Sequence, residues 1–159
     1  MAMVLRKTIF SLRPTFVTII SIIATAKVMG YSGMTTTIAD HTVAATGLMY
    51  PAIAAFIGSV GGFITGSATS TCILLGKLQM DAAIAIGATE STQVWIAAAN
   101  ATGACADKII APQSIAIGVA AIGVAGRGNE SQLLSLALKV YIPFILLLGC
   151  LVYVGRIWL

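Results

Sequence analysis

The chain has 159 residues, of which 58% are hydrophobic and 9% are charged. A soluble globular domain carries about 25% charged residues, so this composition excludes an ordinary soluble protein and predicts an integral membrane protein. The net charge of +4 comes from scattered Lys and Arg residues, which argues against binding of nucleic acid. With about 20 residues for each helical crossing, the length allows roughly five or six full or partial crossings in a single transmembrane domain, residues 1–159.

The sequence also argues against an enzyme. It holds a single His, and it shows no metal-ligand cluster, nucleophile motif or phosphate-binding loop. We therefore expect no cofactor and no metal, and any transport would run on an ion gradient. The three cysteines form no CxxC pair and are predicted to be free thiols within the membrane: Cys72, Cys105 and Cys150.

The N-terminal part predicts a basic segment and two helices. Residues 1–13 are a cytoplasmic segment, because Lys and Arg accumulate on that side. The apolar run 14–29 is the first predicted spanning helix, and a turn follows it. A second helix, residues 34–48, is polar for a membrane segment. Its adjacent Asp40 and His41 are either a proton-handling pair lining a cavity or groups satisfied locally by neighbouring helices or the interface.

Residues 50–76 contain a polar break, TGSATST at 65–71, between two apolar flanks. Each flank is shorter than the roughly 20 residues of a crossing, so we predict a re-entrant hairpin. Lys77 and Asp81 are expected to mark its return to the surface, before a connector over 82–92. Three glycines of the first flank are predicted to allow close helix packing: Gly58, Gly61 and Gly62.

The most unusual stretch is AAANATGACADKIIAPQSIAIG, residues 97–118. Gly103 and Pro112 are predicted to interrupt it, since proline lacks an amide hydrogen and disfavours helix at the preceding residue. Asp107 and Lys108 lie between these two residues. Charges and broken backbone at membrane depth are tolerated only inside protein or around a watery cavity. We therefore predict a broken transmembrane helix with a site for a small polar or ionic ligand.

The broken helix is predicted over 93–122, a surface loop over 123–131 and the longest helix over 132–158, which Pro143 is expected to kink. In the predicted layout, residues 34–49 return across the membrane and the hairpin opens to the cytoplasm. This layout keeps most basic residues on the cytoplasmic side. The two polar breaks then meet near the middle of the bilayer. The predicted class is an all-α polytopic membrane protein with a re-entrant hairpin and a broken transmembrane helix.

The meeting of two breaks suits an organic anion, because helix N-termini offer amide hydrogens and a partial positive charge. Lys108 adds a full positive charge there or pairs with Asp107, and the Ser and Thr hydroxyls are either ligands or helix caps. The candidate substrate-binding residues are Thr65, Gly66, Ser67, Thr69, Ser70, Asn100, Thr102, Gly103, Lys108, Gln113 and Ser114. The candidate proton-coupling residues are Asp40, His41 and Asp107.

Three phrases resemble the C-terminal part of the L-lactate permease family: TGSATST (65–71), AANATG (98–103) and KIIAPQSIAIG (108–118). The resemblance implies secondary transport of L-lactate and related 2-hydroxy monocarboxylates, such as glycolate, with protons across the plasma membrane of a prokaryote. It also implies a fold of inverted repeats with broken helices, of which this chain is one half. Family members are far longer, so the chain is expected to be a split subunit, a truncated product or a fragment.

The chain departs from the family pattern at two positions. Ala68 stands where the pattern favours Asp, and Asp107 stands where it favours a small residue. Three hypotheses remain open: a carrier for lactate-like anions that supplies one half or one subunit of the site, a non-transporting fragment or accessory subunit that packs on a full-length permease, and a small channel formed by oligomers. The sequence leaves open the choice between H⁺ and Na⁺ and the identity of the hydroxy acid.

Overall fold

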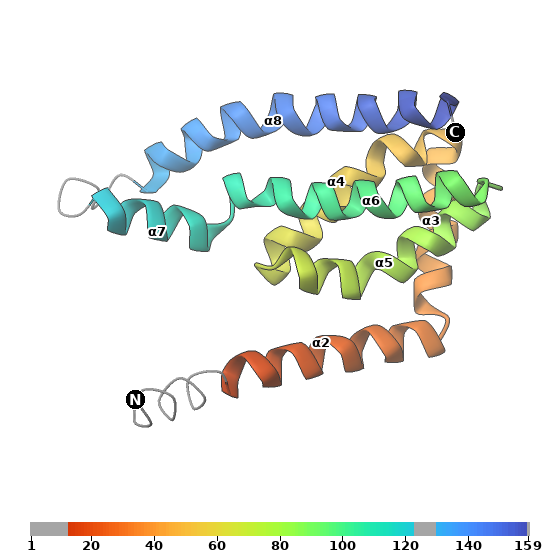
Figure 1. Cartoon of the computed structure of the whole chain (residues 1–159), viewed down its shortest axis with the longest axis horizontal. Coiled ribbons are helices and arrows are strands. Elements are labelled where there is room, and N and C mark those ends of the chain that lie inside the picture. Colours follow the sequence, from red (N-terminus) through yellow and green to blue (C-terminus); the bar gives the residue numbers. More distant parts are fainter. Residues whose placement is uncertain (1–12, 123–129, 159) are drawn as a thin grey trace.

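The computed structural model describes residues 13–122 and 130–158, and all regular elements in these residues are helical, which confirms the predicted class (Figure 1). The elements are α2 (Arg13–Tyr31), α3 (Met34–Thr46), η1 (Gly47–Met49), α4 (Tyr50–Thr65), α5 (Ala68–Ala85), α6 (Glu90–Ala106), η2 (Asp107–Ile109), α7 (Pro112–Ile122), α8 (Glu130–Gly155) and η4 (Arg156–Trp158). Nearly all of the predicted basic segment and most of the predicted loop over 123–131 lie outside the described residues.

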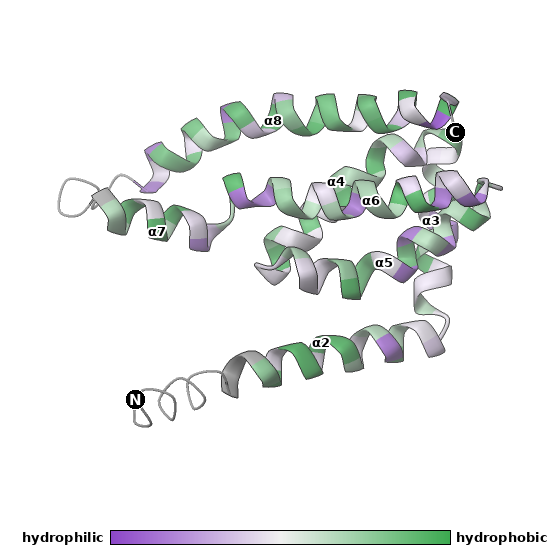
Figure 2. Cartoon of the chain, in the orientation of Figure 1, coloured by the Kyte–Doolittle hydropathy of each residue, from purple (hydrophilic) through white to green (hydrophobic). Residues whose placement is uncertain are grey.

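Among the described residues, three stretches are long and apolar enough to cross a membrane: Met34–Thr65, Glu90–Ala121 and Glu130–Trp158. Apolar colour follows most helices in Figure 2, and hydrophilic colour returns where α6 meets α7. The chain is therefore a polytopic membrane protein. The described apolar part of α2, Phe16–Tyr31, is shorter than these stretches, so a crossing by the first helix stays a prediction.

The predicted second helix is confirmed as α3, but its path differs from a simple return beside α2. Figure 1 shows α3 running across the ends of α2 and α5, and it packs against both. The turn before it needs Gly33, whose φ of 73° is left-handed and strained for other residues. Through η1, α3 leads into α4 in a new direction, so the stretch Met34–Thr65 is bent.

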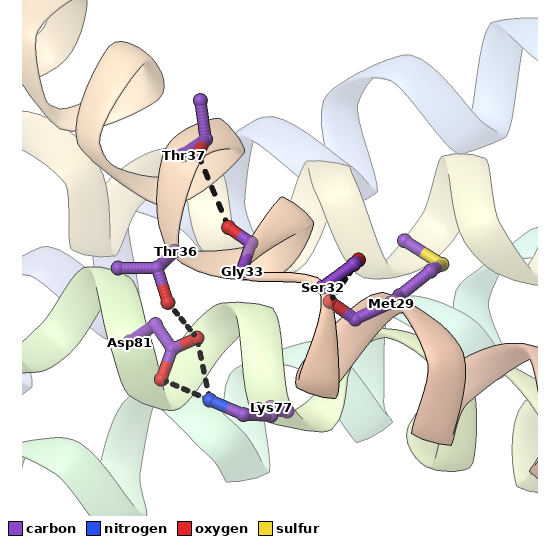
Figure 3. Close-up of polar contacts among 7 residues, drawn as sticks. All are labelled: Met29, Ser32, Gly33, Thr36, Thr37, Lys77 and Asp81. Carbon is purple, nitrogen blue, oxygen red and sulfur yellow. Dashed lines mark hydrogen bonds and ion pairs between the residues drawn. The ribbon is translucent and has the colours of Figure 1, made fainter.

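Polar contacts hold α3 to α5 (Figure 3). The Thr36 hydroxyl donates to Oδ2 of Asp81 at 3.2 Å, and Nζ of Lys77 lies 2.8 Å from both carboxylate oxygens. Because Lys77 and Asp81 are four residues apart, their pairing supports the helix that contains them. The start of the connector predicted over 82–92 is wrong, since α5 continues to Ala85. That Lys77 and Asp81 mark a return to the membrane surface stays a prediction.

Gly103 does not interrupt the broken helix, contrary to expectation. It is buried inside α6, where an added Cβ would collide with the backbone of Ala55 and lie 2.7 Å from its carbonyl carbon. The helix instead ends at Ala106, and the chain passes through η2 before Pro112 begins α7. The proline therefore sets the break as its chemistry predicts, and the glycine allows close packing.

The glycines of α4 and α6 form a close seam between these two helices. A Cβ at Gly58 would lie 2.8 Å from Cα of Asn100, and one at Gly62 would lie 2.9 Å from the carbonyl oxygen of Ala104. Together with Gly103, these residues bring the two backbones into direct contact. The predicted packing role of the α4 glycines is confirmed for these two.

The last helix covers the other side of α4. α8 is continuous through Pro143, and its Gly149 lies where a Cβ would meet the carbonyl oxygen of Ala52 at 2.6 Å. The hydroxyls of Ser59 and Tyr141 are 2.7 Å apart, which joins α4 to α8 inside the core. The helices α5, α6 and α8 thus all pack against α4, and the four helices form one unit.

Candidate functional site at two helix breaks

The two polar breaks meet, as the sequence predicts. Nζ of Lys108, in η2, donates a hydrogen bond of 2.6 Å to the carbonyl oxygen of Gly66, between α4 and α5. The side chain of Gln113 lies against the same glycine, because a Cβ there would be 3.1 Å from Cδ of Gln113. A cation and a neutral amide from the broken helix therefore both face the bend of the hairpin.

The bend itself is closed by its own hydroxyl groups. Gly66 has a φ of 67°, and Ser67 caps α5 by accepting from the amide of Ser70 at 3.3 Å. The Thr65 hydroxyl donates to the carbonyl of Ser67 at 2.9 Å and lies 2.8 Å from the hydroxyl of Thr71. Capping of α5 therefore accounts for Ser67, and local hydrogen bonds at the bend account for Thr65 and Thr71, while Thr69 is exposed beside them.

The AANATG phrase contributes less to this contact than expected. Asn100 is buried, and its Oδ1 accepts from Nε2 of Gln79 at 3.2 Å, so its amide belongs to the core. Thr102 is exposed and donates to the carbonyl of Ala98 at 2.9 Å. With Gly103 packed on Ala55, the structure does not bring these three predicted residues to the meeting of the breaks.

Asp107 occupies an unusual position beside Lys108. Its side chain is fully buried against Gly62, where a Cβ would lie 2.7 Å from Cγ of Asp107. Neither carboxyl oxygen has a hydrogen-bond partner, although the amide of Lys108 lies nearby. Asp107 and Lys108 form no ion pair with each other. Within residues 13–122 and 130–158, the ion pair that the structure shows joins Lys77 to Asp81. The alternative in which Lys108 pairs with Asp107 is therefore not the arrangement seen.

The other proton-coupling candidates lie elsewhere. Asp40 and His41 are exposed on α3, which Figure 1 places at the end of the bundle away from the junction of α6 and α7. They do not approach the two breaks. Ser114, in the first turn of α7, is half-buried, and its amide donates to the carbonyl of Ala111 at 2.9 Å. Of the charged candidates, Asp107 and Lys108 are the ones at the site.

The site is open on the surface of this chain. The side chains of Lys108 and Gln113 are exposed, and the grooves that flank α4 are apolar. One groove of about 380 Å³ runs between α4 and α5 and ends at Thr65, and another of about 330 Å³ lies between α4, η2 and α8. A small anion at Lys108 would be covered on one side only.

Sequence reasoning missed a buried polar network. The hydroxyl of Tyr50 donates to Oε1 of Gln79 at 2.6 Å, and Nε2 of Gln79 donates to Ala54 and Asn100. The signal was a Gln between Leu78 and Met80, because a polar side chain requires hydrogen-bond partners when it is buried. It also missed Thr71, a member of the TGSATST phrase that lies in the first turn of α5.

Comparison with known proteins matches the model of the L-lactate permease family to residues 1–157, which include both breaks. The chain belongs to the L-lactate permease family. An L-lactate permease of Bacillus subtilis (strain 168) is 40% identical over 149 residues, covering 94% of this chain and 25% of the relative. The glycolate permease GlcA of Escherichia coli (strain K12) is 40% identical over 146 residues, covering 92% of this chain and 25% of the relative.

An L-lactate permease of Streptococcus iniae is 47% identical over 102 residues, covering 64% of this chain and 21% of the relative. The chain thus spans about a quarter of the length of the L-lactate permeases and the glycolate permease that it matches. No solved structure matches it significantly. The relatives named here are permeases, which are transporters.

Proposed function

We propose that this chain is part of a secondary transporter that carries L-lactate and related 2-hydroxy monocarboxylates, such as glycolate, with protons across the plasma membrane of a prokaryote. The observation that carries the proposal is the ammonium group of Lys108 at the bend of the hairpin, within a chain of this family. The printed names of the relatives supply the substrate class.

The chemistry of the two breaks fits a 2-hydroxy acid. Lys108 would bind the carboxylate, since an ammonium group binds a carboxylate through a charge-assisted hydrogen bond. The side-chain amide of Gln113 would bind the 2-hydroxyl group, because it both donates and accepts. The first turns of α5 and α7 add their partial positive charge to the same side of the substrate.

The open face of the site supports a second component. A substrate at Lys108 and Gln113 would remain half exposed, and this chain spans only about a quarter of the relatives it matches. Transporters built from repeats place the substrate between two such parts. We propose that the other face is supplied by the missing portion of a permease or by a second copy of this chain.

A different candidate function is an accessory subunit that packs on a full-length permease without binding substrate. The same open, apolar surface favours it, because such a surface also fits a neighbouring membrane helix. In that case Lys108 would serve only to hold the two breaks together.

Uptake of labelled L-lactate into proteoliposomes separates these functions. The chain is reconstituted alone and together with the N-terminal part of a relative, with and without an inward proton gradient. We expect saturable, gradient-driven uptake that Lys108→Gln and Gln113→Ala reduce at least tenfold, roughly the loss of one charge-assisted hydrogen bond. Lys139→Gln, which removes an exposed Lys of α8, is the matched control and keeps full uptake.

Three other results would contradict the proposal. Uptake that does not change in Lys108→Gln would remove Lys108 from the substrate site. A complete lack of uptake in both reconstitutions, from protein with intact helical circular dichroism, would favour the accessory subunit. Conductance that does not saturate would favour a channel.

A further inference from the structure

The carboxyl group of Asp107 is buried without a hydrogen-bond partner, so it requires a ligand if it is to be ionised. Its side chain is fully buried, and neither oxygen accepts a hydrogen bond. Transfer of an ionised carboxylate into such a place is costly unless a partner compensates it, so a group of this kind binds a proton or a cation. The carboxyl group packs closely on Gly62, which has no Cβ to occupy that space; an added Cβ would lie 2.8 Å from Oδ1.

The surroundings of Asp107 leave Lys108 as the charge that acts on it. The helices α4 and α7 carry no charged side chain. The helix α6 carries the thiol of Cys105 and also Glu90, which lies in its first turn, at the end far from Asp107. On α8, the hydroxyl of Tyr141 faces Ser59, and Glu130 and Lys139 are exposed. Within the described part of the chain, the charge that acts on Asp107 is that of Lys108.

Lys108 nevertheless points to a different acceptor. Its ammonium group donates to the neutral carbonyl of Gly66 rather than to the adjacent carboxyl group. A protonated, neutral Asp107 accounts for both facts, because it neither needs nor attracts the ammonium group. An ionised Asp107 would compete for Lys108 with any other anion, since opposite charges at low dielectric attract strongly.

Resting on the proposed function, we propose that Asp107 and Lys108 form a proton-controlled switch for the substrate anion. A proton taken from water on one side binds the carboxylate of Asp107 and leaves the ammonium group of Lys108 free to bind the substrate carboxylate. When the proton leaves to water on the other side, Lys108 pairs with Asp107 and the anion is released. One proton then moves with one monocarboxylate, and the charges balance.

Infrared spectroscopy of the purified chain in lipid tests the proton itself, without substrate. At neutral pH we expect a carboxylic acid C=O band that disappears as the pH rises and is absent from Asp107→Asn. The control Glu90→Gln, which alters an exposed acid at the other end of the same region, keeps the band. In Lys108→Gln the band should persist to higher pH, whereas Lys139→Gln should leave it unchanged.

Calorimetry of L-lactate binding tests the switch. Once Asp107 loses its proton, the affinity should fall about tenfold for each further pH unit, as linkage to one proton requires. Asp107→Asn should bind L-lactate with an affinity that no longer changes with pH, and Lys108→Gln should bind weakly at every pH.

The outcomes separate the switch from the proposed function. L-lactate uptake without an Asp107 band, or with unchanged pH dependence in Asp107→Asn, would overturn the switch and leave the transport function in place. A band that requires Asp107 and responds to Lys108→Gln, in a chain that shows no uptake, would support the pairing of the two groups and refute transport by this chain. Uptake driven by Na⁺ that requires Asp107, with no band, would assign the carboxylate to a cation instead.

Discussion

The carbonyl oxygen of Gly66 accepts a hydrogen bond of 2.6 Å from Lys108, which lies 42 residues later in the chain. One cation thus joins the bend of the hairpin to the end of α6. The proposed substrate anion would use the same cation, because the ammonium group has three N–H donors and the carbonyl of Gly66 takes one of them. The bond that joins the two breaks would then also hold the cation in place for the substrate.

The contact at Gly66 can be tested against a second glycine with the same backbone conformation. Gly66 and Gly87 both have a φ of 67°, but a Cβ at Gly66 would collide with the Gln113 side chain, whereas one at Gly87 meets nothing within 4 Å. Both Ala variants should lose about 1 kcal/mol through backbone strain. Gly66→Ala should in addition displace the flexible Gln113 side chain at little further cost in stability, and it alone should lower L-lactate uptake. Unfolding in detergent and the uptake assay measure the two effects, and unchanged uptake in Gly66→Ala would contradict a role for the contact.

The seam between α4 and α6 predicts a strong asymmetry between two helical glycines. Gly103→Ala would drive its methyl group into the Ala55 backbone and should cost about 1–3 kcal/mol of unfolding free energy. Gly76→Ala, in the middle of α5 with nothing within 4 Å of the new Cβ, should be neutral or slightly stabilising. Unfolding in SDS, followed by circular dichroism, compares them. A tolerated Gly103→Ala would show that the seam is looser than described.

The buried network around Gln79 should stabilise the core. Gln79→Ala leaves the hydroxyl of Tyr50 and the amide of Asn100 without their partner, which should cost about 1–3 kcal/mol. Gln132→Ala, at an exposed position of α8, should change the unfolding free energy by less than about 0.5 kcal/mol. The same unfolding assay applies. Loss of uptake without loss of stability in Gln79→Ala would instead assign the network to transport.

Ser67 allows capping to be separated from substrate binding. Ser67→Ala should destabilise the protein by about 1 kcal/mol, because α5 loses its N-cap. Ser67→Asn and Ser67→Asp both restore a cap, so both should recover the stability. Ser67→Asp adds a negative charge beside Lys108 and should still impair L-lactate uptake, whereas Ser67→Asn should retain it. Impaired uptake in the Asn variant would indicate a direct contact of the Ser67 hydroxyl with substrate.

The contact between α3 and α5 should depend on pH through Asp81. Burial acts to raise the pKa of Asp81, but the hydrogen bond and charge of Lys77, with the Thr36 hydroxyl, hold this pKa below its usual value. A lowered pKa contributes stability above the unfolded value of about 3.9, and that stability is lost as the pH falls through the folded value. Asp81→Asn should therefore flatten the acid side of the stability profile, whereas Asp40→Asn, on the exposed face of α3, should not.

Much of the fold follows from local chemistry. Pro112 fixed the position of one break because it cannot continue a helix, and the polar TGSATST phrase fixed the other through capping at Ser67. Gly103 was misread because a glycine in a polar phrase is equally suited to a break and to a close helix contact. The choice depends on whether another backbone lies opposite, and Ala55 is almost fifty positions away in the sequence.

The candidate site was predictable in part. The meeting of the two breaks was predicted, with Lys108 and Gln113 among its candidate residues, because broken backbone in a membrane protein must lie inside protein or around a cavity. Their contacts with Gly66 were not specified, and their binding of substrate stays a prediction. The role of Asn100 was not predictable, because its partner Gln79 lies three residues beyond the predicted end of the hairpin at residue 76. The direction of α3 was equally hidden, since helical periodicity says nothing about the angle at which a helix leaves its turn.

The glycine seam of α4 and α6 also limits how this molecule can move. Two backbones in direct contact have no side-chain rotamers between them to rearrange, so α4 and α6 travel together as a rigid body. Helix α5 is joined to this pair through Gln79, which bonds to Ala54 of α4 and to Asn100 of α6. In the proposed transport cycle, α7 is therefore the helix that would move against the fixed pair, with residues 107–111 as its hinge.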